Sequence, residues 1–235
     1  NTFDAQLENI SDKMSLLAVQ GPKAVDTLNG LFAEDIAAMA YYTATYAEMK
    51  GVGLVLLSAT GYTGAGGFEV YVPNALAEKA WNAVMAAGKP FGIKPAGLAA
   101  RDTLRLEMAF CLYGNDIDDT PSPLEAGLGW ITKFTKDFTN SAALKAEKEA
   151  GVKNKLVGFE LLERGIPRHG CTVVDAEGNV IGRVTSGTMS PSLQKPIGLA
   201  YVPKDLSAPG TELRIDVRGK VLKAVVVKTP FYTAG

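Results

Sequence analysis

The chain has 235 residues, with 24 Lys and Arg against 25 Asp and Glu, and 47% of its residues are apolar. This is the composition of an ordinary globular protein, and it excludes a disordered, collagen-like or low-complexity chain. The formal net charge of -1 gives no electrostatic footprint for nucleic acid or for an anionic membrane. The longest apolar run, residues 52–59, is much shorter than the ~20 residues that span a bilayer. We therefore expect neither nucleic acid nor a membrane as a partner.

The cysteine and histidine content indicates no metal site. Cys111 and Cys171 are far apart in the sequence, and the single histidine is His169. Their spacing matches no usual zinc site, and two cysteines in this arrangement favour a reducing, cytosol-like compartment. Cys111 lies among apolar residues, which favours packing, and His169 favours a surface or capping role. The chain opens with Asn1 and lacks an initial methionine, which indicates a processed or truncated chain.

The first 150 residues predict a mixture of strands and helices. Aromatic and apolar runs predict strands over residues 14–19, 41–49, 51–58 and 68–72. Apolar residues at helical spacing after Gly21-Pro22 predict a short helix. Asn74 predicts the N-cap of a longer helix that ends at Gly88. Two further helices are expected over residues 95–108 and 141–151.

From Lys155 onward the sequence predicts short strands separated by turn signals, with no helix. The strands are expected over residues 156–162, 172–174, 180–186, 197–202, 212–217 and 221–227. Six strands of this kind indicate a small antiparallel barrel or sandwich. The predicted fold class is therefore α+β with two domains. Residues 1–152 form an α+β portion, and residues 153–235 form the C-terminal β domain.

Residues 60–67 (TGYTGAGG) form a glycine-rich connection between two predicted strands. A phosphate-binding P-loop would end in Gly-Lys-Ser/Thr, and a dinucleotide-binding motif would open a helix, so both are disfavoured. A hairpin with a tight turn at positive φ is one interpretation. The other is a hairpin whose backbone approaches a flat ligand, with Tyr62 supplying an aromatic ring. The residues alone leave both open.

A carboxylate lies inside the apolar strand that follows this connection. Strand alternation places Glu69 and Tyr71 on the face opposite Phe68, Val70 and Val72. If the second set faces the core, Glu69 is either a solvated residue or a carboxylate that lines a ligand pocket. Both interpretations stay open.

The predicted helix over residues 95–108 carries several charges. Arg101 and Asp102 belong either to the polar stripe of an amphipathic helix or to a half-buried face. On a half-buried face an arginine needs a carboxylate partner, and Glu69 is one candidate. We assign Arg105 and Glu107 to the solvated stripe.

Motifs along most of the chain resemble one known family, the T protein of the glycine cleavage system, an aminomethyltransferase. The motifs are residues 17–24 (LAVQGPKA), 60–69 (TGYTGAGGFE), 97–107 (GLAARDTLRLE), 112–116 (LYGND), 123–130 (PLEAGLGW), 165–168 (GIPR) and 182–191 (GRVTSGTMSP). They occur in the family's order, and the resemblance runs from about residue 10 to Tyr232. Together these motifs are highly specific.

The resemblance implies transfer of a methylene carbon from the aminomethyl-lipoyl arm of H protein to tetrahydrofolate, with release of ammonia. Tetrahydrofolate is then the acceptor substrate, lipoylated H protein is the partner, and no metal is involved. By motif position, Glu69 is similar to the family's pterin-binding glutamate, Arg101 to its folate-site arginine, and Tyr62 to a tyrosine near the pterin. Tyr113 and Tyr232 are further candidate folate contacts. We expect Glu69 and Arg101 to face one cavity.

The sequence departs from the family pattern in two places. Ala65 stands where many members have glutamate, which reduces the charge of the loop. The family also has an upstream GGxxDD-type segment with its catalytic aspartate, and these 235 residues contain no such segment. Asp102 and Asp116 belong to other motifs and do not replace it. We therefore expect no catalytic residue in this chain, and an inactive fragment.

Two other functions stay open. One is a folate-binding scaffold or sensor without catalysis, although the signature of the iron–sulfur assembly homologues is absent. The other is the T-like domain of a folate-dependent demethylating oxidase. The expected compartment is the bacterial cytoplasm, or the mitochondrial matrix of a eukaryote.

Overall fold

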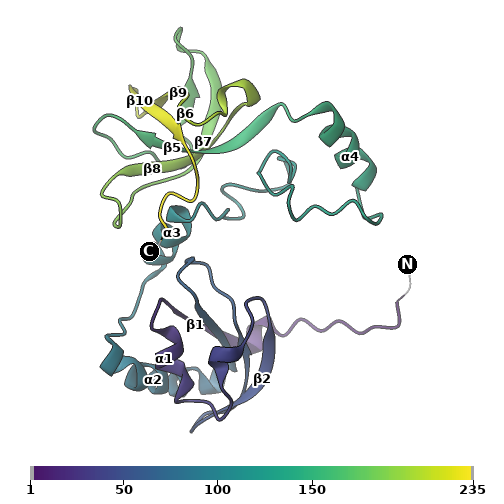
Figure 1. The fold of residues 1–235 in the computed structure, drawn as a ribbon, viewed down its shortest axis with the longest axis vertical. Coiled ribbons are helices and arrows are strands. Elements are labelled where there is room, and N and C mark those ends of the chain that lie inside the picture. The colour runs from purple at the N-terminus through teal and green to yellow at the C-terminus, as the bar shows by residue number, and fades with distance from the viewer. Residues whose placement is uncertain (1–2, 234–235) are drawn as a thin grey trace. The chain divides into compact units, whose positions relative to one another are not determined.

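The computed structural model describes residues 3–233, and the chain divides into two compact units, Asn1–Gly97 and Leu98–Gly235 (Figure 1). Each unit has its own sheet and its own apolar core. The expected domain boundary at residues 152–153 stays a prediction.

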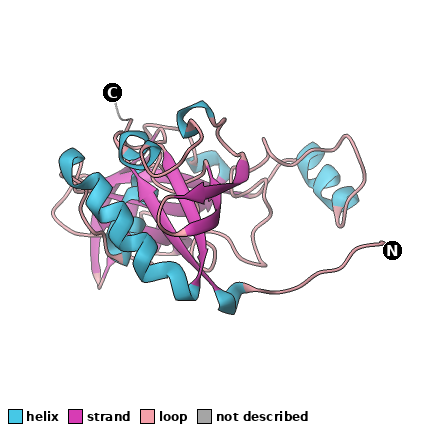
Figure 2. Cartoon of the chain, turned by 90° about the horizontal axis from the view of Figure 1, so that it is seen from below, coloured by secondary structure: helices cyan, strands magenta, loops and turns pink. Residues whose placement is uncertain are grey.

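The first unit is a four-stranded antiparallel sheet with helices packed on one face (Figure 2). The strands lie in the order β1-β4-β3-β2, with bounds β1 Met14–Gln20, β2 Ala44–Met49, β3 Gly53–Ser58 and β4 Gly67–Pro73. The helices are α1 Ala24–Asn29 and α2 Ala77–Gly88, with 3-10 turns at Ser11–Lys13, Ile36–Ala38, Asn74–Leu76 and Lys89–Phe91. Alternate residues of β4, among them Val70 and Val72, are buried against Leu28 and Val84 of the helices.

The start of α2 differs from the sequence prediction. Asn74 is not its N-cap; it opens a 3-10 turn, and Leu76 is the N-cap without a capping side chain. The Asn74 side chain instead accepts a hydrogen bond from Ser15 Oγ at 2.8 Å and donates one to Asp12 O at 2.7 Å. The amide thus ties the segment before β1 to the end of β4, and this tertiary contact outweighs its local capping preference.

The second unit contains two helices and a closed six-stranded barrel (Figure 1). The helices are α3 Leu98–Glu107 and α4 Ser141–Ala150. The strands are β5 Asn154–Leu161, β6 Thr172–Val174, β7 Val180–Met189, β8 Pro196–Pro203, β9 Glu212–Val217 and β10 Lys220–Val227, with a 3-10 turn at Lys204–Leu206. They pair antiparallel in the closed order β10-β5-β8-β7-β6-β9. The predicted α+β fold with a C-terminal antiparallel barrel is confirmed.

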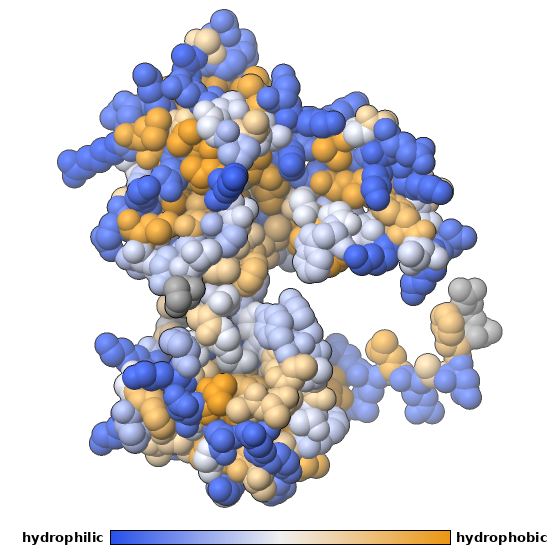
Figure 3. Space-filling view, viewed as in Figure 1, coloured by the Kyte–Doolittle hydropathy of each residue, from blue (hydrophilic) through white to orange (hydrophobic). Residues whose placement is uncertain are grey.

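Alternation along the strands fills the barrel with apolar side chains. Phe159, Val184, Ile215 and Leu222 are almost completely buried in its core. Closure pairs every strand on both sides, so the barrel has no free sheet edge. On the outer surface, hydrophobic and hydrophilic side chains are interspersed on the face that Figure 3 shows, which is typical of a folded protein.

Two valines of β10 test this placement. Val226 is 2% exposed and belongs to the barrel core, whereas Val221 on the same strand is 50% exposed. We expect Val226→Ala to lower the free energy of unfolding by about 2 kcal/mol, because it removes buried methyl groups and leaves a cavity. Val221→Ala is the matched control and should change it by less than about 0.5 kcal/mol. Urea unfolding followed by circular dichroism measures both, and equal losses would contradict the inward placement of Val226.

Candidate functional site

The glycine-rich connection is a hairpin loop between β3 and β4. The two strands pair with Ser58 opposite Glu69, and the loop residues 59–66 join them. Gly64, Gly66 and Gly67 have φ values of 68°, 75° and 139°, a region that side chains with a Cβ rarely adopt. A Cβ on Gly67 would also lie 2.3 Å from the carbonyl oxygen of Val19. The hairpin with positive φ is therefore present, and a strand rather than a helix follows the glycines.

Glu69 lies on the sheet face opposite the core, as strand alternation predicts. Its neighbours Phe68 and Val70 are 4% and 0% exposed, whereas Glu69 is half-buried. The Thr60 hydroxyl donates a hydrogen bond to Glu69 Oε2, and Ser58 Oγ lies 2.9 Å from Thr60 Oγ1. The loop thus turns back onto the strand and holds one oxygen of the carboxylate. Strand alternation and loop composition alone do not indicate these contacts of Ser58 and Thr60.

Tyr41 and Tyr71 of the same unit lie close enough to this carboxylate to feel its charge. Burial raises the pKa of Tyr71, and the negative charge of Glu69 raises it further. Burial also raises the pKa of Tyr41. Smaller contributions in the same direction come from the hydrogen bond with Tyr42, from the charge of Tyr42 and, smallest, from the charge of Glu69. Tyr62 is half-buried in the loop itself. A carboxylate among phenol rings can accept adjacent N–H groups while the rings contact a flat ligand.

The other candidate residues, Arg101, Tyr113 and Tyr232, all belong to the second unit. Arg101 is exposed in the first turn of α3. Tyr113 is 70% exposed, its hydroxyl donates to Asp119 Oδ1 at 3.2 Å, and the charge of Asp119 raises its pKa. Tyr232 is 38% exposed, and its backbone N–H donates to Glu107 O at 3.1 Å. The expectation that Glu69 and Arg101 face one cavity stays a prediction.

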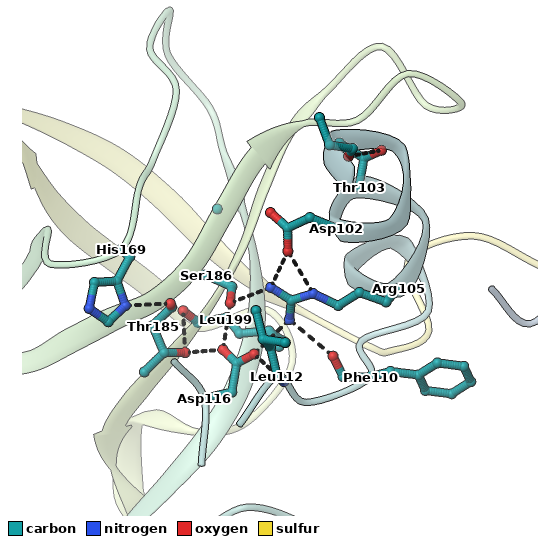
Figure 4. Close-up of polar contacts among 12 residues, drawn as sticks. Asp102, Thr103, Arg105, Phe110, Leu112, Asp116, His169, Thr185, Ser186 and Leu199 are labelled. Carbon is teal, nitrogen blue, oxygen red and sulfur yellow. Dashed lines mark hydrogen bonds and ion pairs between the residues drawn. The ribbon is translucent and has the colours of Figure 1, made fainter. Parts of the chain in front are cut away.

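Arg105 is not part of a solvated stripe; it is 1% exposed at the centre of a polar network (Figure 4). Its Nε and one terminal nitrogen donate to Asp102 Oδ1 at 2.9 and 2.6 Å, and that nitrogen also donates to Ser186 Oγ at 2.9 Å. The other terminal nitrogen donates to Phe110 O at 3.0 Å and to Asp116 Oδ2 at 2.6 Å. All five N–H donors of the guanidinium are therefore used.

Asp116 carries the opposite charge of this network and is completely buried. Besides Arg105, it accepts hydrogen bonds from the hydroxyls of Thr185 and Ser186 at 2.5 and 2.7 Å and from Leu112 N at 2.9 Å. Burial alone would lower the pKa of Arg105, but the carboxylates outweigh it and raise that pKa above its usual value. The ion pair therefore ties α3 and the loop after it to strand β7.

Glu107 is also buried, at 2% exposed, which corrects its assignment to the solvated stripe. Its carboxylate accepts hydrogen bonds from the Ser190 hydroxyl at 2.5 Å and from the Ser192 backbone and hydroxyl at 3.0 and 2.8 Å. Helical spacing alone could not reveal this, because the partners come from the barrel, more than 80 residues downstream.

His169 and Cys111 show no sign of a catalytic role, in line with the sequence prediction. His169 is exposed, and its Nδ1 lies 2.9 Å from Thr185 O, a capping contact with strand β7. Burial, together with the charge of Asp116, raises the pKa of the Cys111 thiol to about 11. Such a thiol is protonated at neutral pH and is no nucleophile.

The buried ion pair is testable against an exposed one in the same unit. Asp116→Ala leaves the Arg105 guanidinium buried without its fully buried charge partner, so we expect a loss of about 3–5 kcal/mol in the free energy of unfolding. Glu160→Ala removes the ion pair between Glu160, 22% exposed, and Lys195, 57% exposed. This loss should cost less than about 1 kcal/mol. Chemical denaturation measures both. A loss below 1 kcal/mol for Asp116→Ala would contradict the structural role of the network.

Comparison with known proteins places the whole chain in one family. Residues 1–136 match the family model of the GCVT N-terminal domain, and residues 154–233 match that of the glycine cleavage T-protein C-terminal barrel domain. The aminomethyltransferase of Flavobacterium psychrophilum is 59% identical over 232 residues, covering 99% of this chain. That of Bacteroides fragilis is 59% identical over 233 residues, covering 98%.

A solved structure supports the same relationship. The crystal structure of glycine cleavage system aminomethyltransferase T from Bartonella henselae matches with a TM-score of 0.72 and 25% identity, over 93% of this chain and 84% of that chain. The chain therefore belongs to the glycine cleavage T-protein family. It spans 64% of the length of the Flavobacterium and Bacteroides relatives.

The described part of the chain holds neither a cluster of metal ligands nor a membrane-spanning helix. Residues 3–233 contain no group of three or more His, Cys, Asp or Glu placed to hold a metal ion. Within the same residues, no helix has both the length and the apolar character needed to cross a membrane.

Proposed function

We propose that this chain provides the folate-binding part of an aminomethyltransferase of the glycine cleavage system. Its relatives over nearly its whole length bear that name, and their bacterial sources favour the bacterial cytoplasm. The donor is the aminomethyl group on the lipoyl arm of H protein, and the acceptor is tetrahydrofolate. The observation that carries the proposal is Glu69, a half-buried carboxylate held by the glycine-rich hairpin on the sheet face opposite the core.

The chemistry of Glu69 suits a pterin. A pterin presents a ring N–H and an exocyclic amine side by side, and a carboxylate accepts both in a charge-assisted, two-point contact. The Thr60 hydroxyl uses only one of about four lone-pair positions of the carboxylate, which leaves acceptor capacity for the ligand. The ring of Tyr62, in the same hairpin, is the proposed stacking partner for the pterin face.

The residues of the second unit are proposed to bind the rest of the folate. Arg101 is exposed, and its guanidinium suits the carboxylates of the anionic glutamyl tail. Tyr113 and Tyr232 present partly exposed phenol rings as additional contacts. None of these residues is proposed to transfer the proton in the chemical step.

Glu69→Gln tests the pterin contact. The substitution keeps the shape of the side chain but replaces one acceptor oxygen by a donor, so we expect the tetrahydrofolate affinity to fall by about 1.5–3 kcal/mol, or roughly 10- to 150-fold. Titration calorimetry on the full reading frame that contains residues 1–235 measures the change. Glu78→Gln, on an exposed position of α2, is the matched control. An unchanged affinity for Glu69→Gln would remove Glu69 from the site.

The catalytic capacity of residues 1–235 is a separate prediction. We expect this polypeptide alone to release no detectable ammonia from aminomethylated lipoyl H protein and tetrahydrofolate. A general acid–base group contributes about 10²–10⁴-fold to rate, and fixed geometry of donor and acceptor can contribute ~7–11 kcal/mol. The full reading frame is the positive control. Ammonia release by residues 1–235 at a rate comparable to the control would place the catalytic group within this chain. If residues 1–235 and the full reading frame both bind folate but neither releases ammonia, a non-catalytic scaffold would be favoured.

A further inference from the structure

We propose that Gln20 and Thr60 are positioning residues that orient the Glu69 carboxylate for its ligand. The inference rests on the proposed function of Glu69, and it adds two residues to which neither the sequence motifs nor the relatives' names assign a role. Both residues belong to the first unit, within the same hairpin and adjacent strand as Glu69.

Gln20 closes the glycine-rich loop with a single side-chain amide. It is the last residue of β1 and pairs with Gly67, the first residue of β4. Its Nε2 donates to the carbonyl oxygens of Thr60 and Phe68, both at 3.2 Å, and its Oε1 accepts from Thr63 Oγ1 at 3.3 Å. The amide therefore holds the start of the loop, its middle and its return into the strand.

The loop is shaped to receive this amide. A Cβ on Gly61 would lie 1.8 Å from Gln20 Oε1, and a Cβ on Gly67 would lie 2.9 Å from Gln20 Nε2. Both glycines thus let the loop backbone lie directly against the Gln20 side chain. At Gly61, where φ is not in the left-handed region, a Cβ would displace the Gln20 amide from its place against the loop.

Thr60 connects the fixed backbone to the carboxylate. Gln20 holds the Thr60 carbonyl, and the Thr60 hydroxyl donates to Glu69 Oε2. A hydroxyl has one proton, and an ionised carboxylate only accepts. The 2.9 Å contact between Thr60 Oγ1 and Ser58 Oγ therefore has Ser58 donating to Thr60. Thr60 has its proton committed to Glu69, which fixes the direction of the carboxylate before the ligand arrives.

Preorganisation of this kind predicts a specific loss on substitution. Without the Thr60 hydroxyl, Glu69 gains rotamer freedom that ligand binding must remove again. We expect Thr60→Val, which keeps the shape and removes the donor, to weaken tetrahydrofolate binding about 3- to 10-fold, the range for one hydrogen bond. Gln20→Glu, which keeps the shape and removes both N–H donors, should give a loss of the same order.

The experiment measures tetrahydrofolate affinity by calorimetry on the full reading frame, with thermal unfolding as a check of folding. Thr60→Ser keeps the hydroxyl and should bind within twofold of the unsubstituted protein. Thr45→Val, at an exposed threonine of β2, is the matched control and should have no effect. In a Glu69→Ala background, Thr60→Val should cause no further loss, because its effect acts through that carboxylate.

The outcomes separate this inference from the proposed function. Unchanged affinity for Thr60→Val would overturn the positioning role while the function of Glu69 stands. An equal loss from Thr60→Val in the unsubstituted protein and in the Glu69→Ala background would have the same meaning. Unchanged affinity for Glu69→Ala itself would overturn both. If Gln20→Glu fails to unfold cooperatively, the Thr60 variants alone decide between these outcomes.

Discussion

A buried guanidinium must have every N–H group satisfied, and Arg105 meets this constraint by joining three parts of the second unit. Its five donors end on Asp102 in its own helix, on Phe110 and Asp116 in the following loop, and on Ser186 in strand β7. Loss of any partner would leave a buried charge incompletely bonded, which is costly in a low-dielectric interior. The helix, the loop and the barrel strand are therefore bound into one arrangement by a single side chain.

This constraint reaches the candidate folate residue on the same helix. Arg101 lies four residues before Arg105, so the two side chains project from the same side of α3. Because Arg105 is fixed to Asp116 and Ser186, the rotation of α3 about its axis is fixed as well. The direction in which Arg101 leaves the helix thus depends on the buried network around Arg105.

Features that depend on residues close in sequence were predictable, whereas features that depend on residues far apart in sequence were not. Strand alternation correctly placed Val70 and Glu69 on opposite faces of the sheet, because the period of two is a local property, but it left open which face meets the core. The glycine-rich hairpin was predictable for the same reason. Asn74 was wrongly assigned as a helix cap and Glu107 as a solvated residue. Asn74 is bound by Ser15 and Glu107 by Ser190, and only the folded chain brings these distant residues together.

The Arg105–Asp116 pair and Glu69 differ in how fully their hydrogen-bonding capacity is used. Arg105 and Asp116 are at most 1% exposed, and the donors of the guanidinium are all committed within the protein. Such a centre cannot recognise a ligand without breaking a bond that stabilises the fold. Glu69 is half-buried, and the Thr60 hydroxyl takes one of several acceptor positions. A carboxylate that is fixed in direction but not saturated can bind a ligand at little cost in ordering, and this property, rather than burial or charge alone, favours Glu69 as the proposed binding group.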